Sequence, residues 1–322
     1  MDTAGHRGIA MSGDMKIAVF FVGEVQDDGF NASALAGAER AAQDGLAAIT
    51  LVSGVRYDQD EIRARLAEVV PEVDGLVFIG GQGNIATPEI AARHPDKRFA
   101  IVQGQKTGAN LASYDVRQED SAFLAGVLAA HLSRTGIVGH LSGHRVRPGL
   151  KGRAAFVAGV AHADPGVKVL TGFCGTQDDS AVTRRWAKAE IAGGADVLFT
   201  MLNAARRGAV EACRAGRVWQ IGNALDWVAK DPEVFVASAL ARIDLGVERA
   251  IGDMVAGHCP EAIVEFGLNT GDAVSLRLGS AVPAAAATAV EAAASALRAG
   301  RISIPDTYDG PEFEPEAVRC DG

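Results

Sequence analysis

Apolar runs alternate with amphipathic stretches along most of this chain of 322 residues. Residues 16–23 (KIAVFFVG) form a continuous apolar run that ends in glycine, which is typical of a strand buried on both faces. Residues 31–44 follow with apolar side chains at helical spacing. The same pattern predicts further strands at 47–52, 75–80 and 99–103, a helix at 60–70, and a helix that starts with Thr87 as N-cap and Pro88 in the first turn.

A second series of the same kind begins after Ser113. Repeated strand–helix units favour a parallel sheet with helices on both faces. We therefore predict an α/β fold with two similar lobes, each built on a doubly wound parallel sheet. The second series has expected strands at 137–141, 167–173, 197–201, 218–221 and 234–238, and expected helices at 119–134, 152–163, 180–192, 204–215 and 241–257.

The chain is expected to cross between the lobes more than once. The first lobe would contain residues 15–106 and about 239–258, and the second 107–238 and about 259–322, with residues 1–14 as a flexible tail. Ligands bind at the carboxyl edges of parallel strands. Two such edges facing each other would enclose a small molecule in a cleft between the lobes.

The charge and the cysteine content argue against several classes of function. With 31 basic and 40 acidic residues the net charge is −9, which gives no attraction for a nucleic-acid backbone. Cys174, Cys213, Cys259 and Cys320 form no CxxC pair, so buried thiols are expected rather than a zinc site or a redox dithiol.

The first 15 residues are polar and glycine-rich, without an apolar signal region or a lipobox. The apolar run at 17–22 is too short to span a membrane, and no transmembrane segment is expected. As written, the sequence predicts a cytoplasmic protein, or a periplasmic or lipid-anchored one if a signal has been removed.

Candidate ligand-binding residues lie where predicted strands end. In the segment DDGFN (27–31), a heterocyclic ring could stack on Phe30 while Asp27 and Asn31 bind its polar edge. The same residues also suit an acidic N-cap with a phenylalanine staple, and the local sequence leaves both interpretations open. Gly81 opens a GxGxxA loop, but a dinucleotide site would require an acid where Gln103 stands, so a glycine-rich turn is favoured.

Strand ends of the second series carry similar side chains. The acids of GTQDD (175–179) could cap the following helix or contact a ligand, and Trp227 could supply a second stacking face or belong to an interface. The candidates here are Gln177, Asp178, Asn203, Asp226 and Trp227.

Nothing in the sequence indicates catalysis or a cofactor. His140 and His144 form an HxxxH pattern on a glycine-rich loop, which is a weak metal signal because no helix aligns the two rings. No nucleophile–base pair is suggested by local context. We predict no cofactor, no metal and no catalytic residue, and the chain is not expected to be an enzyme.

Seven segments, taken in order, resemble the basic membrane protein family of nucleoside-binding solute receptors of ABC transporters. The resemblance runs from Lys16 to Pro305 and is carried by DDGFN (27–31), FLAG (123–126), RTGIVGHLSG (134–143), FVAGVAHADPGVKVL (156–170), GTQDD (175–179), GGADVLF (193–199) and ALRAGRISIP (296–305). It implies a type I periplasmic-binding fold that closes on a purine nucleoside by hinge motion, with an ABC permease as partner. By resemblance Phe30 would stack on the base, Asp27 and Asn31 would bind its edge, and Asp226 would face the sugar.

The chain departs from the family on the ribose side. The family often has an aspartate where Gln103 stands, an aromatic residue at Gln177, an aspartate at Ala224 and a lysine near Ala241. Losing charge-assisted hydrogen bonds should weaken ribose recognition. We therefore expect an altered ligand, such as a free base, a modified nucleoside or another heterocycle. The alternative is a cytoplasmic protein that has recruited this fold as an enzyme or a ligand sensor.

Overall fold

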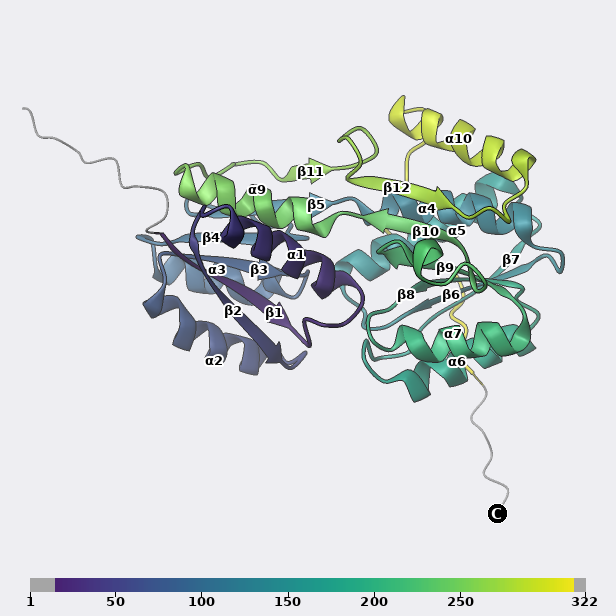
Figure 1. Cartoon of the computed structure of the whole chain (residues 1–322), viewed down its shortest axis with the longest axis horizontal. Coiled ribbons are helices and arrows are strands. Elements are labelled where there is room, and N and C mark those ends of the chain that lie inside the picture. Colours follow the sequence, from purple (N-terminus) through teal and green to yellow (C-terminus); the bar gives the residue numbers. More distant parts are fainter. Residues whose placement is uncertain (1–14, 316–322) are drawn as a thin grey trace, which may run out of the picture. The chain divides into compact units, whose positions relative to one another are not determined.

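A computed structural model describes residues 15–315 and shows two compact units (Figure 1). Among these residues, the first unit contains 15–24, 35–114 and 246–264, and the second contains 25–34, 115–245 and 265–315. The segment that carries DDGFN therefore belongs to the second unit. The expected tail at 1–14 and Cys320 lie outside the described residues.

The first sheet has six strands in the order β11-β5-β4-β3-β1-β2. The continuous apolar run of β1 is buried from Ile17 to Val22, as expected for a strand covered on both faces. Parallel pairing joins β2, β1, β3, β4 and β5. The strands are β1 (Lys16–Val22), β2 (Ala48–Val55), β3 (Gly75–Ile79), β4 (Arg98–Val102), β5 (Leu111–Val116) and β11 (Val264–Phe266), and the accompanying helices are α1 (Phe30–Gln43), α2 (Gln59–Val69), the 3-10 helix η2 (Val70–Glu72), α3 (Gly83–Arg93) and α9 (Ile243–Val255).

The second sheet has the order β12-β10-β9-β8-β6-β7. Its strands pair in parallel except for β12, which runs antiparallel to β10. The α/β fold with two parallel sheets is thus confirmed. The strands are β6 (Ile137–Ser142), β7 (Lys168–Phe173), β8 (Val197–Met201), β9 (Trp219–Ala224), β10 (Phe235–Ala241) and β12 (Val274–Leu278), and the helices are α4 (Gln118–Leu132), α5 (Arg147–Ala163), α6 (Ser180–Ala192), α7 (Arg206–Gly216), α8 (Trp227–Lys230) and α10 (Ala284–Arg298).

Two differences between the sequence predictions and these elements have a physical explanation. Strand β5 was missed because its buried sequence LASYDV includes polar side chains, which find partners: the Ser113 hydroxyl donates to the carbonyl of Lys106 (2.6 Å) and the Tyr114 hydroxyl to Asp253 (2.9 Å). Helix α3 begins at Gly83 rather than after Thr87. The glycine-rich loop itself forms the first turn, since the amides of Gly83, Asn84 and Ile85 donate to carbonyls three residues earlier.

Glycines of two sequence segments, FLAG (123–126) and FVAGV (156–160), bring α4 and α5 together. A Cβ on Gly126 would lie 2.1 Å from the carbonyl oxygen of Phe156, and a Cβ on Gly159 would lie 2.0 Å from that of Phe123. No other residue has room at either position. These two helices therefore pack backbone to backbone within the second unit.

Candidate functional site

Asp27 organises the loop that leads into α1. Its side chain is 1% exposed, and its carboxylate accepts backbone hydrogen bonds from Gly29 (2.8 Å), Asn31 (3.0 Å) and Ala32 (2.9 Å). Burial raises the pKa of Asp27, and the three hydrogen bonds oppose that rise. The residue thus holds the start of α1, and its contact with a ligand stays a prediction.

Arg206, at the first position of α7, lies near Asp27 in the second unit and is 1% exposed. Its Nη2 donates to the carbonyl of Leu202 and to Oδ1 of Asn223 (2.6 Å), and its Nη1 donates to the carbonyl of Asn223 (3.4 Å). Burial lowers the pKa of Arg206 to about 9, against the opposing charges of Asp27 and Asp28. Within the described part of the chain, Nε has no hydrogen-bond partner.

Two positively charged side chains lie over the indole ring of Trp227. The guanidinium carbon of Arg206 lies 4.3 Å from the ring centroid, and Nζ of Lys230 lies 4.6 Å from it. The indole N–H donates to the carbonyl of Asn223 (3.1 Å), and Lys230 also pairs with Asp28 (2.9 Å). Trp227 thus packs on Arg206, while Lys230 links α8 to the loop that contains Asp27.

A cavity of about 210 Å³ opens among these groups within the second unit. Of the residues predicted from sequence, Asp27, Asn203 and Trp227 line it, and Arg206 joins them. It is smaller than the roughly 300–1,000 Å³ of sites for drug-sized ligands, so it suits a single planar ring better than a large ligand. It combines an acceptor, an amide, a charged donor and an aromatic face.

The other second-unit candidates do not line this cavity. Gln177 holds the backbone at Asn203, since Oε1 of Gln177 accepts a hydrogen bond from the backbone N–H of Asn203 (3.1 Å). Asp226 caps α8 by accepting from Ala229 (3.1 Å) and pairs with Arg277 (2.9 Å). Phe30 and Asn31 open α1, and Asp178 is exposed before α6, which is capped by Asp179.

Two candidates, Gly81 and Gln103, belong to the first unit. Both are held by Asn84, whose side-chain amide donates to the carbonyl of Gly81 (2.9 Å) and to that of Gln103 (3.4 Å). Gln103 is buried and has a φ of +68°, a left-handed conformation that non-glycine residues adopt rarely. This loop pair is built around Asn84, which the sequence analysis did not single out.

Arg206 was also missed from the sequence. The sequence did contain a hint of it, because Arg206 and Arg207 follow the end of the predicted strand at 197–201, where ligand-binding residues were expected. Adjacent arginines at a helix start are usually solvated, and local sequence does not reveal that one of them is buried.

His140 and His144 do not form a metal site. His140 is fully buried, with Nδ1 2.9 Å from the hydroxyl of Thr171 and Nε2 3.2 Å from that of Ser142, and burial lowers its pKa to about 3. Among residues 15–315, no group of three or more His, Cys, Asp and Glu side chains is placed to hold a metal ion. Of the thiols in that range, Cys213 is buried, whereas Cys174 and Cys259 are half-buried.

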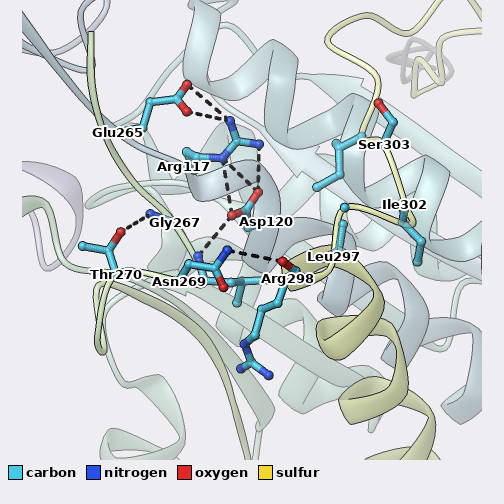
Figure 2. A pocket seen from close by; sticks show the side chains of 13 residues that line it. Arg117, Asp120, Glu265, Gly267, Asn269, Thr270, Leu297, Arg298, Ile302 and Ser303 are labelled. Carbon is cyan, nitrogen blue, oxygen red and sulfur yellow. Dashed lines mark hydrogen bonds and ion pairs between the residues drawn. The ribbon is translucent and has the colours of Figure 1, made fainter.

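A larger cavity of about 510 Å³ lies elsewhere in the second unit, beside the C-terminal end of α10. Figure 2 shows Arg117 between the carboxylates of Asp120 and Glu265, at 3.2 and 3.3 Å. The side-chain amide of Asn269 donates to the carbonyl of Arg298 (3.4 Å). Because these polar groups already bind one another, the smaller cavity is the better candidate site.

No helix between residues 15 and 315 has the length and apolar character that a membrane span requires.

Comparison with known proteins places the chain in a family. The family model described as ABC transporter substrate-binding protein, PnrA-like, matches residues 15–285. An uncharacterized lipoprotein of Pyrococcus furiosus is 28% identical over 276 residues, which is 80% of this chain and 69% of that protein. A purine-binding protein of Brucella abortus is 28% identical over 124 residues, 38% of this chain and 35% of that protein.

Similarity of fold to solved structures covers more of the chain than sequence similarity to the relatives above. An ABC transporter solute-binding protein from Aeropyrum pernix superimposes with a TM-score of 0.81 at 22% identity, covering 92% of this chain and 94% of that one. At this identity the match shows the fold alone, which is the type I periplasmic-binding architecture. The family match over residues 15–285 establishes that the chain belongs to the basic membrane protein family of PnrA-like ABC substrate-binding proteins.

Proposed function

We propose that this chain binds a purine base, a purine nucleoside or a related heterocycle and passes it to the permease of an ABC importer. The observation that carries the proposal is the cavity where Asp27, Asn203, Arg206 and Trp227 meet. A planar heterocycle needs hydrogen-bonding groups for its edge and an aromatic or cationic plane beside it, and this set supplies both. The name of the Brucella abortus relative, a purine-binding protein, supports the ligand class.

A free base or a modified nucleoside fits the site better than an ordinary nucleoside. Asp226, which the resemblance assigns to the sugar, already caps α8 and pairs with Arg277. The side-chain oxygen of Gln177 already accepts a hydrogen bond from the backbone N–H of Asn203. Gln177 carries no charge, and the charge of Asp226 is paired with Arg277, so hydrogen bonds to a ribose hydroxyl would be weaker here and the sugar contributes less affinity.

Ligand binding would close the two units by a hinge motion, as in other receptors of this class, and the closed form would dock on the permease. The name of the Pyrococcus furiosus relative, a lipoprotein, supports a location outside the cytoplasm. Small-angle scattering with and without ligand tests the closure: the radius of gyration should fall on binding. Fractionation of cells that produce the native protein tests the location.

The ligand class is tested by native mass spectrometry of the purified protein, followed by calorimetric titration with hypoxanthine, adenine, inosine and adenosine. The expected result is saturable binding of at least one base, tighter than its nucleoside. Asn203→Ala, which removes an amide from the lining of the cavity, should weaken binding at least tenfold, whereas Leu51→Ala, at an exposed position of the first unit, should not. Absence of binding by all four compounds would contradict the proposal, and tighter binding of the nucleosides would contradict the preference for a base.

A further inference from the structure

We propose that Arg206 reads the edge of the base and makes the site prefer 6-oxopurines, such as hypoxanthine, over the 6-aminopurine adenine. This inference rests on the proposed function, because it requires that a purine enters the cavity lined by Asp27, Arg206 and Trp227.

The guanidinium of Arg206 is buried, and not all of its hydrogen-bond donors have an acceptor in the described part of the chain. It carries five N–H groups, and its three hydrogen bonds all come from Nη1 and Nη2. Nε is buried with no partner among the described residues. A buried donor without an acceptor is unfavourable, so an acceptor atom of a ligand would complete this group.

Asp27 presents the opposite chemistry to the same cavity. Its carboxylate offers about four acceptor positions, and three backbone amides use one each. The two charges interact, but these two described side chains form no direct ion pair: the bonds of Arg206 go to Leu202 and Asn223. A ligand that lies between them must offer an acceptor to Arg206 and a donor to Asp27.

A 6-oxopurine has that arrangement on one edge. Its O6 accepts and the neighbouring N1–H donates, and arginine pairs with O6 and N7 of guanine in the commonest specific arginine–base contact. Adenine places a donor, its amino group, at the same position and has no hydrogen on N1. In the placement that hypoxanthine adopts, adenine would therefore set its amino donor against the Arg206 donor, and it must turn in the cavity to offer a ring nitrogen instead.

The plane of the guanidinium is fixed in advance. Arg206 lies over the ring of Trp227 and is held from its other nitrogens by Asn223, whose carbonyl also accepts from the indole N–H. A planar group held in this way loses little freedom when a ligand binds. Lysine at the same place would keep the charge but lose the planar fork and the Nε donor.

Calorimetric titration of hypoxanthine and adenine into the wild type, Arg206→Gln and Arg206→Lys tests the proposal. The wild type should prefer hypoxanthine at least tenfold. In Arg206→Gln this preference should fall below threefold, through weaker hypoxanthine binding, and Arg206→Lys should retain part of it. Arg184→Gln removes the same charge from an exposed position on α6 and should leave the preference unchanged.

The wild type alone provides a second readout, which does not depend on the folding of a variant with a buried arginine removed. Unsubstituted purine, which lacks O6, and 1-methylhypoxanthine, which lacks the N1–H, should each bind at least tenfold more weakly than hypoxanthine. If purines bind but neither these analogues nor Arg206→Gln alters selectivity, the role of Arg206 is overturned and the proposed function stands. If no purine binds at all, the proposed function fails, and the role of Arg206 fails with it.

Discussion

The guanidinium of Arg206 stacks on the indole ring of Trp227, with 4.3 Å between the guanidinium carbon and the ring centroid. The two residues belong to different helices, α7 and α8, and the carbonyl of Asn223 accepts hydrogen bonds from both. Gly222 makes room for the ring, since a Cβ there would lie 2.5 Å from its Cδ1 atom. This stack forms one wall of the proposed site.

Replacing Trp227 with alanine should damage both stability and binding. The change removes a cation–π contact with a desolvated arginine, worth about 2 kcal/mol, and leaves Arg206 without its support. We expect unfolding free energy to fall by roughly 2 kcal/mol and affinity for hypoxanthine to fall at least tenfold. Urea unfolding and calorimetry measure the two effects. Trp227→Phe keeps an aromatic face and should retain most of the affinity; equal losses in both variants would contradict a role for the ring.

Asp27 and Asp58 give a matched pair of helix-start aspartates. Asp58 is the N-cap of α2 and accepts from the amides of Asp60 (3.1 Å) and Glu61 (2.9 Å), away from the proposed site. Asparagine at either position should cost about 1 kcal/mol of stability or less, because an amide oxygen can still accept one bond. Only Asp27→Asn should also weaken hypoxanthine binding, by at least tenfold. Comparable binding in the two variants would remove Asp27 from the site.

The close approach of α4 and α5 predicts a strong effect of a single methyl group. Gly126→Ala or Gly159→Ala would force Cβ into a backbone carbonyl and should lower the unfolding free energy by about 2–3 kcal/mol. Gly252 in α9 is the control: a Cβ there meets nothing within 4 Å, so Gly252→Ala should be neutral or stabilising by up to about 1 kcal/mol. Chemical denaturation compares the three, and equal stability would show that the two helices separate without cost.

Glu190 predicts a dependence of stability on pH. It is fully buried in α6, packed against Gly139, and neither carboxyl oxygen has a hydrogen-bond partner in the described part of the chain. Burial raises its pKa well above the usual 4.5 in the folded state. The stability that the protonated form contributes is therefore complete below pH 4.5 and is lost as the pH rises through the folded pKa.

Glu190→Gln should remove this dependence. Relative to the wild type, the variant should gain stability between pH 4.5 and the folded pKa, at a limiting slope of about 1.4 kcal/mol per pH unit. Urea unfolding of both proteins at pH 5, 6, 7 and 8 gives the difference, which cancels contributions from other groups such as His140. A difference that does not change with pH would show that Glu190 is ionised in the folded state.

Local sequence patterns determined most of the helices and strands and their type. The predicted bounds of α6 and β8 match the structure, and β1 is buried from Ile17 to Val22 as its apolar run predicted. Periodicity succeeds there because it reflects which side of a single element faces the core. The family resemblance was likewise carried by local segments, and the glycines of FLAG and FVAGV have a physical reason in the packing of α4 on α5.

Only the tertiary structure decided where the charges lie. Arg206 is buried because Trp227, which is 21 positions later, covers it and Asn223 binds it. Asp27 groups with Asn203 in the second unit although it follows β1 of the first. Burial and pairing of ionic groups depend on neighbours that are distant in sequence, whereas hydrophobic periodicity depends on adjacent turns and strands. The sequence alone therefore predicted the α/β fold and residue types at strand ends, and the packing of separate helices created the candidate site.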